Sequence, residues 1–303
     1  MSKLQTKVEN ALNEARVLVL GSQVLLGFQF RAFFEHGWDT LLPRDRACEL
    51  GGLFALLLTV LVLFLPAARH CLVERGNDSG SFHRFTMRAV RFALLPFAVG
   101  LTLDLAVAGD RIFGAACALA CGAATSMATL LFWYVHFARD DRQPFTEPEE
   151  QMEKTPLSHR IVQVLTETRV VLPGAQALLG FQLAMVLMEP FDKLPVAAKA
   201  VHLASLGCIA LATIVLMAPA AYHRIVERGE DTERFHTFAG RMVLLSLALL
   251  APGFAGDLYV VLVRARIESA ALLGAASLAV FYGVWFGAML WLRHRAPHLG
   301  ERG

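Results

Sequence analysis

The chain has 303 residues, of which 56% are hydrophobic and 18% are charged, and its formal net charge is +2. Its mean hydropathy of +0.51 and its long apolar stretches exclude an ordinary soluble domain. A net charge so close to zero says little about partners, so the placement of the charges carries the information. We therefore expect an all-α, polytopic membrane protein embedded in a lipid bilayer.

Eight apolar stretches are each about long enough to cross a hydrocarbon core of ~30 Å as a helix. They cover residues 17–36, 50–68, 89–109, 112–138, 170–189, 200–222, 242–263 and 268–292. If the N-terminus is cytoplasmic, 20 of the 28 Lys and Arg residues fall on the cytoplasmic side. Because cytoplasmic loops accumulate these residues, we expect both termini to be cytoplasmic.

The chain repeats itself with an offset of 153 residues and without a gap. The recurring polar residues are Glu14 and Glu167, Arg16 and Arg169, Gln23 and Gln176, Gln29 and Gln182, His70 and His223, His83 and His236, and Asp104 and Asp257. Each repeat has an even number of expected spans, so both copies enter the membrane from the same side. We expect two parallel four-helix repeats related by a pseudo-twofold axis along the membrane normal, equivalent to a fused dimer.

This repeat divides the chain into three parts. The first four-helix repeat is expected at 1–138 and the second at 157–303. Between them, residues 139–156 contain several prolines and a run of acidic residues, which favour a solvated, irregular cytoplasmic linker. The pairs Glu14 with Arg16 and Glu167 with Arg169 mark the start of the first span in each repeat.

The strongest local similarity joins residues 66–88 to residues 219–241, with 13 of 23 positions identical, whereas the 23 positions ending at Pro66 keep only 7. On a helix His70 and Glu74 share a face, and Gly76 supplies a helix stop. The turn should then bring His83 back towards them. The predicted inner-face cluster contains His70, Glu74, Asp78 and His83 in the first repeat, and His223, Glu227, Asp231 and His236 in the second.

Three interpretations of this cluster remain open. It can be an ion-paired clasp between two helices, because charges at helix ends near the interface cost little. It can be a proton relay or pH sensor, because His titrates near neutral pH. It can also be a metal or haem b site with ligands His70, His83, His223 and His236, although the spacing matches no standard zinc motif.

Polar residues also recur inside the expected spans. Gln23, Gln29, Gln176 and Gln182 line either a helix-packing seam or a water-accessible path. Asp104 and Asp257 are acids within spans and therefore candidates for ion or proton handling. The alternative is a structural bond to an outer-face partner such as Arg111 or Arg264.

The sequence contains no Walker loop, dinucleotide fingerprint, nucleophile elbow or Cys/His zinc spacing. We therefore expect neither an enzyme nor a nucleic-acid-binding protein. The function that we expect is a proton or small-cation transporter or channel. Two alternatives are a haem- or metal-binding redox protein and a non-catalytic scaffold or accessory subunit, with a basic inner face for anionic lipid or a membrane partner.

Three short motifs carry a resemblance to a known family. They are E-x-R-V at Glu14–Val17, G-x-Q at Gly21–Gln23 and P-A-A-Y-H-R at Pro219–Arg224. Each half resembles a family of uncharacterised bacterial four-helix membrane proteins that are often labelled as candidate sodium:proton antiporters. The resemblance implies a location in the bacterial inner membrane and cation exchange as an activity. The first half departs from it, because Arg69 and Cys71 stand where the second half has Tyr222 and Arg224.

Overall fold

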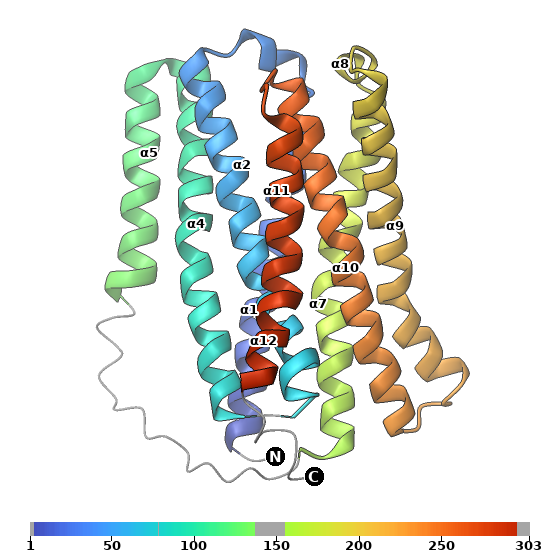
Figure 1. The fold of residues 1–303 in the computed structure, drawn as a ribbon. Helices are drawn as coiled ribbons and strands as arrows, with labels where there is room; N and C mark the ends of the chain where they lie inside the picture. Colours follow the sequence, from blue (N-terminus) through green and yellow to red (C-terminus); the bar gives the residue numbers. More distant parts are fainter. Residues whose placement is uncertain (1–2, 78, 137–154, 296–303) are drawn as a thin grey trace.

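The computed structural model describes residues 3–77, 79–136 and 155–295, and the side chains of residues 3–14, 16, 134–136 and 170 are not part of the description. Asp78 and nearly all of the predicted linker therefore lie outside the described residues. Throughout the described residues the protein is all-α (Figure 1).

The first half contains α1 (Lys3–Ala32), η1 (His36–Thr40), α2 (Pro43–Leu63), α3 (Leu65–Arg69), the π-helical turn η2 (His70–Glu74), α4 (Gly80–Phe113), α5 (Ala115–Leu130) and the π-helical turn η3 (Leu131–His136). The second half contains α7 (Leu157–Val186), α8 (Glu189–Asp192), α9 (Val196–Ile225), α10 (Glu233–Arg264), α11 (Ala270–Tyr282), the π-helical turn η4 (Gly283–Gly287) and α12 (Ala288–Arg295).

Seven helices of the described chain are long and apolar enough to cross a membrane. They are Pro43–Glu74, Gly80–Phe113, Ala115–Trp133, Leu157–Val186, Val196–Ile225, Glu233–Arg264 and Ala270–Arg295. By helix length and hydropathy, the protein is a multi-pass membrane protein. The first expected span differs from the rest, because the apolar part of α1 is a shorter segment, Val17–Ala32.

The helices run along one common direction (Figure 1). Helices α1, α4, α7 and α10 begin at one end of the bundle, and α9 and α12 finish there. We call this the N-terminal end and the other the opposite end. The turns after η2 and after α9, which belong to the two copies of the repeat motif, both lie at the N-terminal end.

The repeat motif forms the same left-handed turn in both halves, directly after η2 in the first half and three residues after the end of α9 in the second. Arg75 and Gly76 have φ angles of +51° and +83°, and Arg228 and Gly229 have φ angles of +52° and +88°. Glycine adopts this left-handed region without steric cost, so the predicted helix stop at Gly76 is confirmed. The next helix then begins at a hydroxyl cap, because Ser79 and Thr232 each accept a bond from the backbone N–H three residues later, at 3.0 Å.

The two halves pack against each other along α1 and α7. A Cβ atom at Gly27 would overlap the ring of Phe181, and a Cβ atom at Gly174 would overlap the amide of Gln23. The Phe28 ring centroid lies 4.4 Å from that of Phe181. Small residues at these points let the two helices approach closely, as is usual between membrane helices.

The fourth helix of each half has a different position. Helix α11 lies over the middle of the bundle (Figure 1). Trp285 of η4, the turn that follows it, donates a hydrogen bond to the Leu61 carbonyl oxygen at 2.8 Å and packs on Phe64. Helix α5 lies at one edge beside α4, and only 6% of its apolar segment is buried. The two repeats therefore contain equivalent helices, but their fourth helices are packed differently.

Candidate functional site

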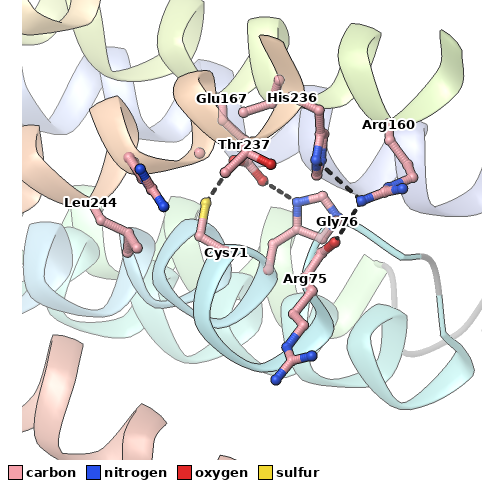
Figure 2. A pocket seen from close by; sticks show the side chains of 12 residues that line it. Cys71, Arg75, Gly76, Arg160, Glu167, His236, Thr237 and Leu244 are labelled. Atoms are coloured by element: carbon pink, nitrogen blue, oxygen red, sulfur yellow. Dashed lines mark hydrogen bonds and ion pairs between the residues drawn. The ribbon is translucent and has the colours of Figure 1, made fainter. Parts of the chain in front are cut away.

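A cavity of about 320 Å³ lies between the two halves at the N-terminal end (Figure 2). Its polar lining comes from η2 and the following turn, from α7 and from α10: His70, Cys71, Arg75, Arg160, Glu167 and His236. The first three belong to the first half, and the last three belong to the second. The cavity therefore exists only because the halves are packed together.

A buried histidine–carboxylate pair forms one wall of this cavity. His70 Nδ1 lies 2.5 Å from Glu167 Oε1, and the two side chains are 2% and 3% exposed. The thiol of Cys71 donates to Glu167 Oε2 at 3.5 Å, so both carboxylate oxygens have a partner (Figure 2). The ring of His70 also stacks on Phe82, at 4.9 Å between centroids. These contacts fix the position of a group that can exchange a proton.

Arg160 lies on the same helix as Glu167, two turns earlier on α7, and also lines the cavity. It donates to the Arg75 carbonyl oxygen at 3.2 Å, to Glu233 at 2.9 Å and to Nδ1 of His236 at 3.1 Å. A guanidinium has no acceptor, so Nδ1 of His236 accepts in this contact and any proton of a neutral ring lies on Nε2. Arg75, Arg160 and Arg241 all line the cavity, which gives it an excess of positive charge around a single carboxylate, Glu167.

The predicted inner-face residues divide into several local groups. Glu74 accepts bonds from Arg69 at 2.9 Å and from Ser79 at 3.0 Å. His223 lies 3.8 Å from Asp231 and is partly exposed. The structure thus brings together His70 and His236, from different halves.

The remaining members of the predicted cluster lie elsewhere. His83 on α4 and Glu227 after α9 are half-buried, and Asp78 is outside the described residues. Among the side chains that the structure describes, no three His, Cys, Asp or Glu residues gather as a metal site would require. The geometry therefore gives no support to the metal alternative at His70, His83, His223 and His236.

Nearer the opposite end, each half contains a glutamine–aspartate pair. Gln29 of α1 donates to Asp104 of α4 at 2.9 Å. Gln182 of α7 donates to both oxygens of Asp257 of α10 at 2.7 Å. The sequence identified these four residues separately, and the structure joins them in matching pairs.

Arg264, which was an expected partner of the aspartates, binds Asp39 of η1 at 2.7 Å. The aspartates therefore have neutral amide partners, and the arginine joins the ends of the two halves.

The other two glutamines differ from each other. Gln23 is fully buried against Gly174, and its amide atoms have no hydrogen-bond partner within the described residues. Its repeat partner Gln176 is exposed. A single path lined by all four glutamines is therefore absent from the arrangement of these side chains. Arg169 is also exposed, and the side chains of Glu14 and Arg16 lie outside the description.

A family model matches the chain twice, at residues 1–137 and 150–289, and its description is a family of unknown function, DUF6328. The chain belongs to the DUF6328 family. The two matched segments cover most of the chain, one in each half, which agrees with the internal repeat. No curated protein and no solved structure matches the chain. Membership in DUF6328 carries no activity with it, so the antiporter label remains an expectation.

Three residues of this DUF6328 chain were missed by the sequence analysis. Glu49 contacts Gln29, and His202 and Ser205 contact Gln182, so all three belong to the glutamine–aspartate clusters. They were missed because repeat identity was the criterion, and these positions differ between the halves. A search for polar residues at equivalent positions, identical or not, would have found Glu49 and His202.

Proposed function

We propose that the protein moves protons or small cations across a membrane, as a transporter or channel. In this proposal α1 also crosses, so eight helices form two co-oriented repeats. The cavity between the halves and both chain ends face the cytoplasm, in agreement with the excess of Lys and Arg at that end.

The carrying observation is the glutamine–aspartate pair that occurs once in each half at the same spacing. Asp257 is 1% exposed, and Asp104 is half-buried. Burying a carboxylate is costly unless its charge is balanced. No Lys or Arg of the described residues contacts either aspartate, so a proton or a bound small cation is the simplest source of the missing charge.

The cavity at the N-terminal end supports the same function. It brings the imidazoles of His70 and His236 and the carboxylate of Glu167 to the interface between the halves. Farther along this interface, the buried amide of Gln23 offers both a donor and an acceptor to water or to a hydrated cation. Polar groups in this position are characteristic of conduction pathways between packed helices.

Proton flux in vesicles tests the proposal. The full chain is reconstituted with a trapped pH-sensitive dye, and a pH, Na⁺ or K⁺ gradient is imposed. We expect a dye response above that of empty vesicles, reduced at least tenfold by Asp104→Asn combined with Asp257→Asn. The exposed Gln176→Ala variant serves as the matched control and should keep the wild-type rate.

A protein that gives no response under any gradient would contradict the proposal, as would a double variant with unchanged flux. A stoichiometric partner that co-purifies with such an inactive protein would then favour the scaffold or accessory-subunit alternative.

A further inference from the structure

The two glutamine–aspartate clusters occupy equivalent positions but have different chemistry. With the offset of 153 residues, Glu49 corresponds to His202 and Gly52 corresponds to Ser205. In the first half, Gln29 Nε2 donates to Glu49 Oε2 at 3.2 Å, to the Glu49 carbonyl oxygen at 3.0 Å and to Asp104 at 2.9 Å. Two carboxyl groups thus share one amide donor.

In the second half, a histidine and a hydroxyl complete the cluster. Ser205 Oγ lies 2.9 Å from Asp257 Oδ1 and 2.9 Å from Gln182 Nε2. His202 Nδ1 lies 3.9 Å from Asp257 Oδ1, and its Nε2 lies 3.2 Å from the Gln182 carbonyl oxygen. This distance is too long for a hydrogen bond, but a proton on His202 would balance the charge of Asp257 through space.

The charge balance of the first cluster is different. Glu49 and Asp104 together carry two negative charges when both are ionised. Binding one proton still leaves one negative charge on the pair. On α2 the neighbouring groups Asp45 and Cys48 supply no positive charge, and the guanidinium of Arg44 is paired with Asp110 at 2.9 Å. In the described residues, no cation contacts Glu49 or Asp104. The first cluster therefore needs a proton or a cation from solution, whereas His202 can supply the positive charge of the second cluster.

The amide of Gln29 also points to a ligand. Its side chain is only 4% exposed, and its Oε1 atom has no hydrogen-bond partner among the described groups. This oxygen belongs to the same amide that contacts both carboxyl groups, so it is a neutral ligand atom beside the cluster. Gln182 Oε1 is also without a partner in the described residues, so the amide oxygen is common to both clusters and the carboxyl pair distinguishes the first. Oxygen atoms of carboxylates and amides are the ligands that hard cations prefer.

The two clusters also differ in their packing and in their exposure. A Cβ atom at Gly52 would lie 2.8 Å from Asp104 Oδ1 and 2.9 Å from Gln29 Nε2, so this glycine lets the carboxyl and amide groups pack against the α2 backbone. Ser205 fills the equivalent position. Every member of the second cluster is at most 2% exposed, whereas Glu49 and Asp104 are half-buried. The first cluster is therefore less enclosed by protein than the second.

We propose that Gln29, Glu49 and Asp104 form the exchangeable site of this protein, which binds one proton or one small monovalent cation, and that the second-half cluster is a closed copy in which His202 replaces that cation. This inference rests on the proposed function and deepens it, because it assigns the two halves different roles. The two halves would then have the same fold but different roles.

Infrared difference spectroscopy of the full chain in detergent, between low and high pH, tests this assignment. We expect a titrating carboxylic-acid C=O band in the wild type that is lost in Glu49→Gln and in Asp104→Asn and kept in Asp257→Asn. Added NaCl separates the two ligands: if Na⁺ binds, it suppresses the band, and if only a proton binds, the band does not change. Either result supports the site.

A variant that converts the second cluster into a copy of the first provides the reverse test. His202→Glu with Ser205→Gly copies the first cluster into the second half and should add a second titrating band. Helix content and a single symmetric elution peak confirm that each variant is folded. No titrating band in the wild type, or a band that survives both first-half variants, would overturn the assignment.

Flux measurements separate this inference from the proposed function. If Asp104→Asn and Asp257→Asn reduce flux equally, the asymmetry is wrong and transport stands. If the band behaves as expected and no flux is seen, the site stands and transport is wrong.

Discussion

The turns at Arg75–Gly76 and Arg228–Gly229 have nearly the same backbone, but the histidines six residues before each glycine have different surroundings. His70 is 2% exposed and bonded to Glu167 of the other half, whereas His223 is 23% exposed and lies near Asp231 of its own half. Local sequence determines the turn through its glycine and its hydroxyl cap. The contacts of each histidine depend on which distant helix covers the turn, so repeated residues need not have repeated roles.

The packing of the fourth helices should show the largest difference between the halves. Trp285 is fully buried, and Phe132 at the equivalent position is 62% exposed. Trp285→Ala should destabilise the protein by about 3–5 kcal/mol, because it removes a buried aromatic and leaves the Leu61 carbonyl without its donor. Phe132→Ala should change stability by less than about 0.5 kcal/mol. Thermal unfolding in one detergent measures both, and equal losses would mean that the fourth helices are packed alike.

The two histidines provide the second test. His70→Ala removes one partner of a buried pair and should cost about 3 kcal/mol, since Glu167 is left uncompensated. His223→Ala removes a partly exposed contact and should cost less than about 1 kcal/mol. Denaturant unfolding of the two variants under identical conditions checks the difference. A larger loss for His223→Ala would place the structural pair in the other half.

Two glycines sharpen the comparison along α1 and α7. A Cβ atom at Gly27 would overlap the Phe181 ring, whereas the equivalent Gly180 has no neighbour within 4 Å. Gly27→Ala should therefore cost about 1–3 kcal/mol through overpacking. Gly180→Ala should be neutral or stabilising by up to ~1 kcal/mol, because alanine favours a helix. Thermal unfolding of the pair decides whether the halves meet at Gly27.

The sequence predicted the parts of the fold that depend on local physics. Long apolar stretches gave the crossing helices, and the Arg–Gly pair gave the turns. It could not predict that Glu167 meets His70, since that contact depends on packing between the halves. The apolar part of α1 is also shorter than the expected span at 17–36, because the helix ends at Ala32.

For the glutamine–aspartate clusters, sequence identity between the halves selected the right four residues. It left out Glu49 and His202, whose difference carries the proposed asymmetry. Divergence between repeats can therefore be as informative as identity, but only after the structure shows which positions share a site. No periodicity in the chain places Gln29 beside Asp104, because they lie on different helices 75 residues apart.

The smallest expected effect concerns an ion pair between the ends of the two halves. The guanidinium of Arg264 bonds Asp39 at 2.7 Å and holds the pKa of Asp39 below its ordinary value. Asp39 is 58% exposed, so the pair should contribute less than about 1 kcal/mol. A carboxyl group whose pKa is lowered by folding stabilises the folded state above its unfolded pKa, and this contribution is lost as the pH falls through the folded pKa.

Asp39→Asn should therefore be slightly less stable than the wild type at pH 7, and the difference should disappear below about pH 4, where the unfolded carboxyl group is protonated. Asp192 and Arg111 are the equivalent residues of the other half, and in the described part of the chain they form no ion pair. Asp192→Asn is thus the matched control, with no expected difference at either pH. Thermal unfolding at both pH values measures the effect. A loss of equal size in Asp192→Asn would indicate that the two ends are closed symmetrically, because only a second bond of the same kind could produce it.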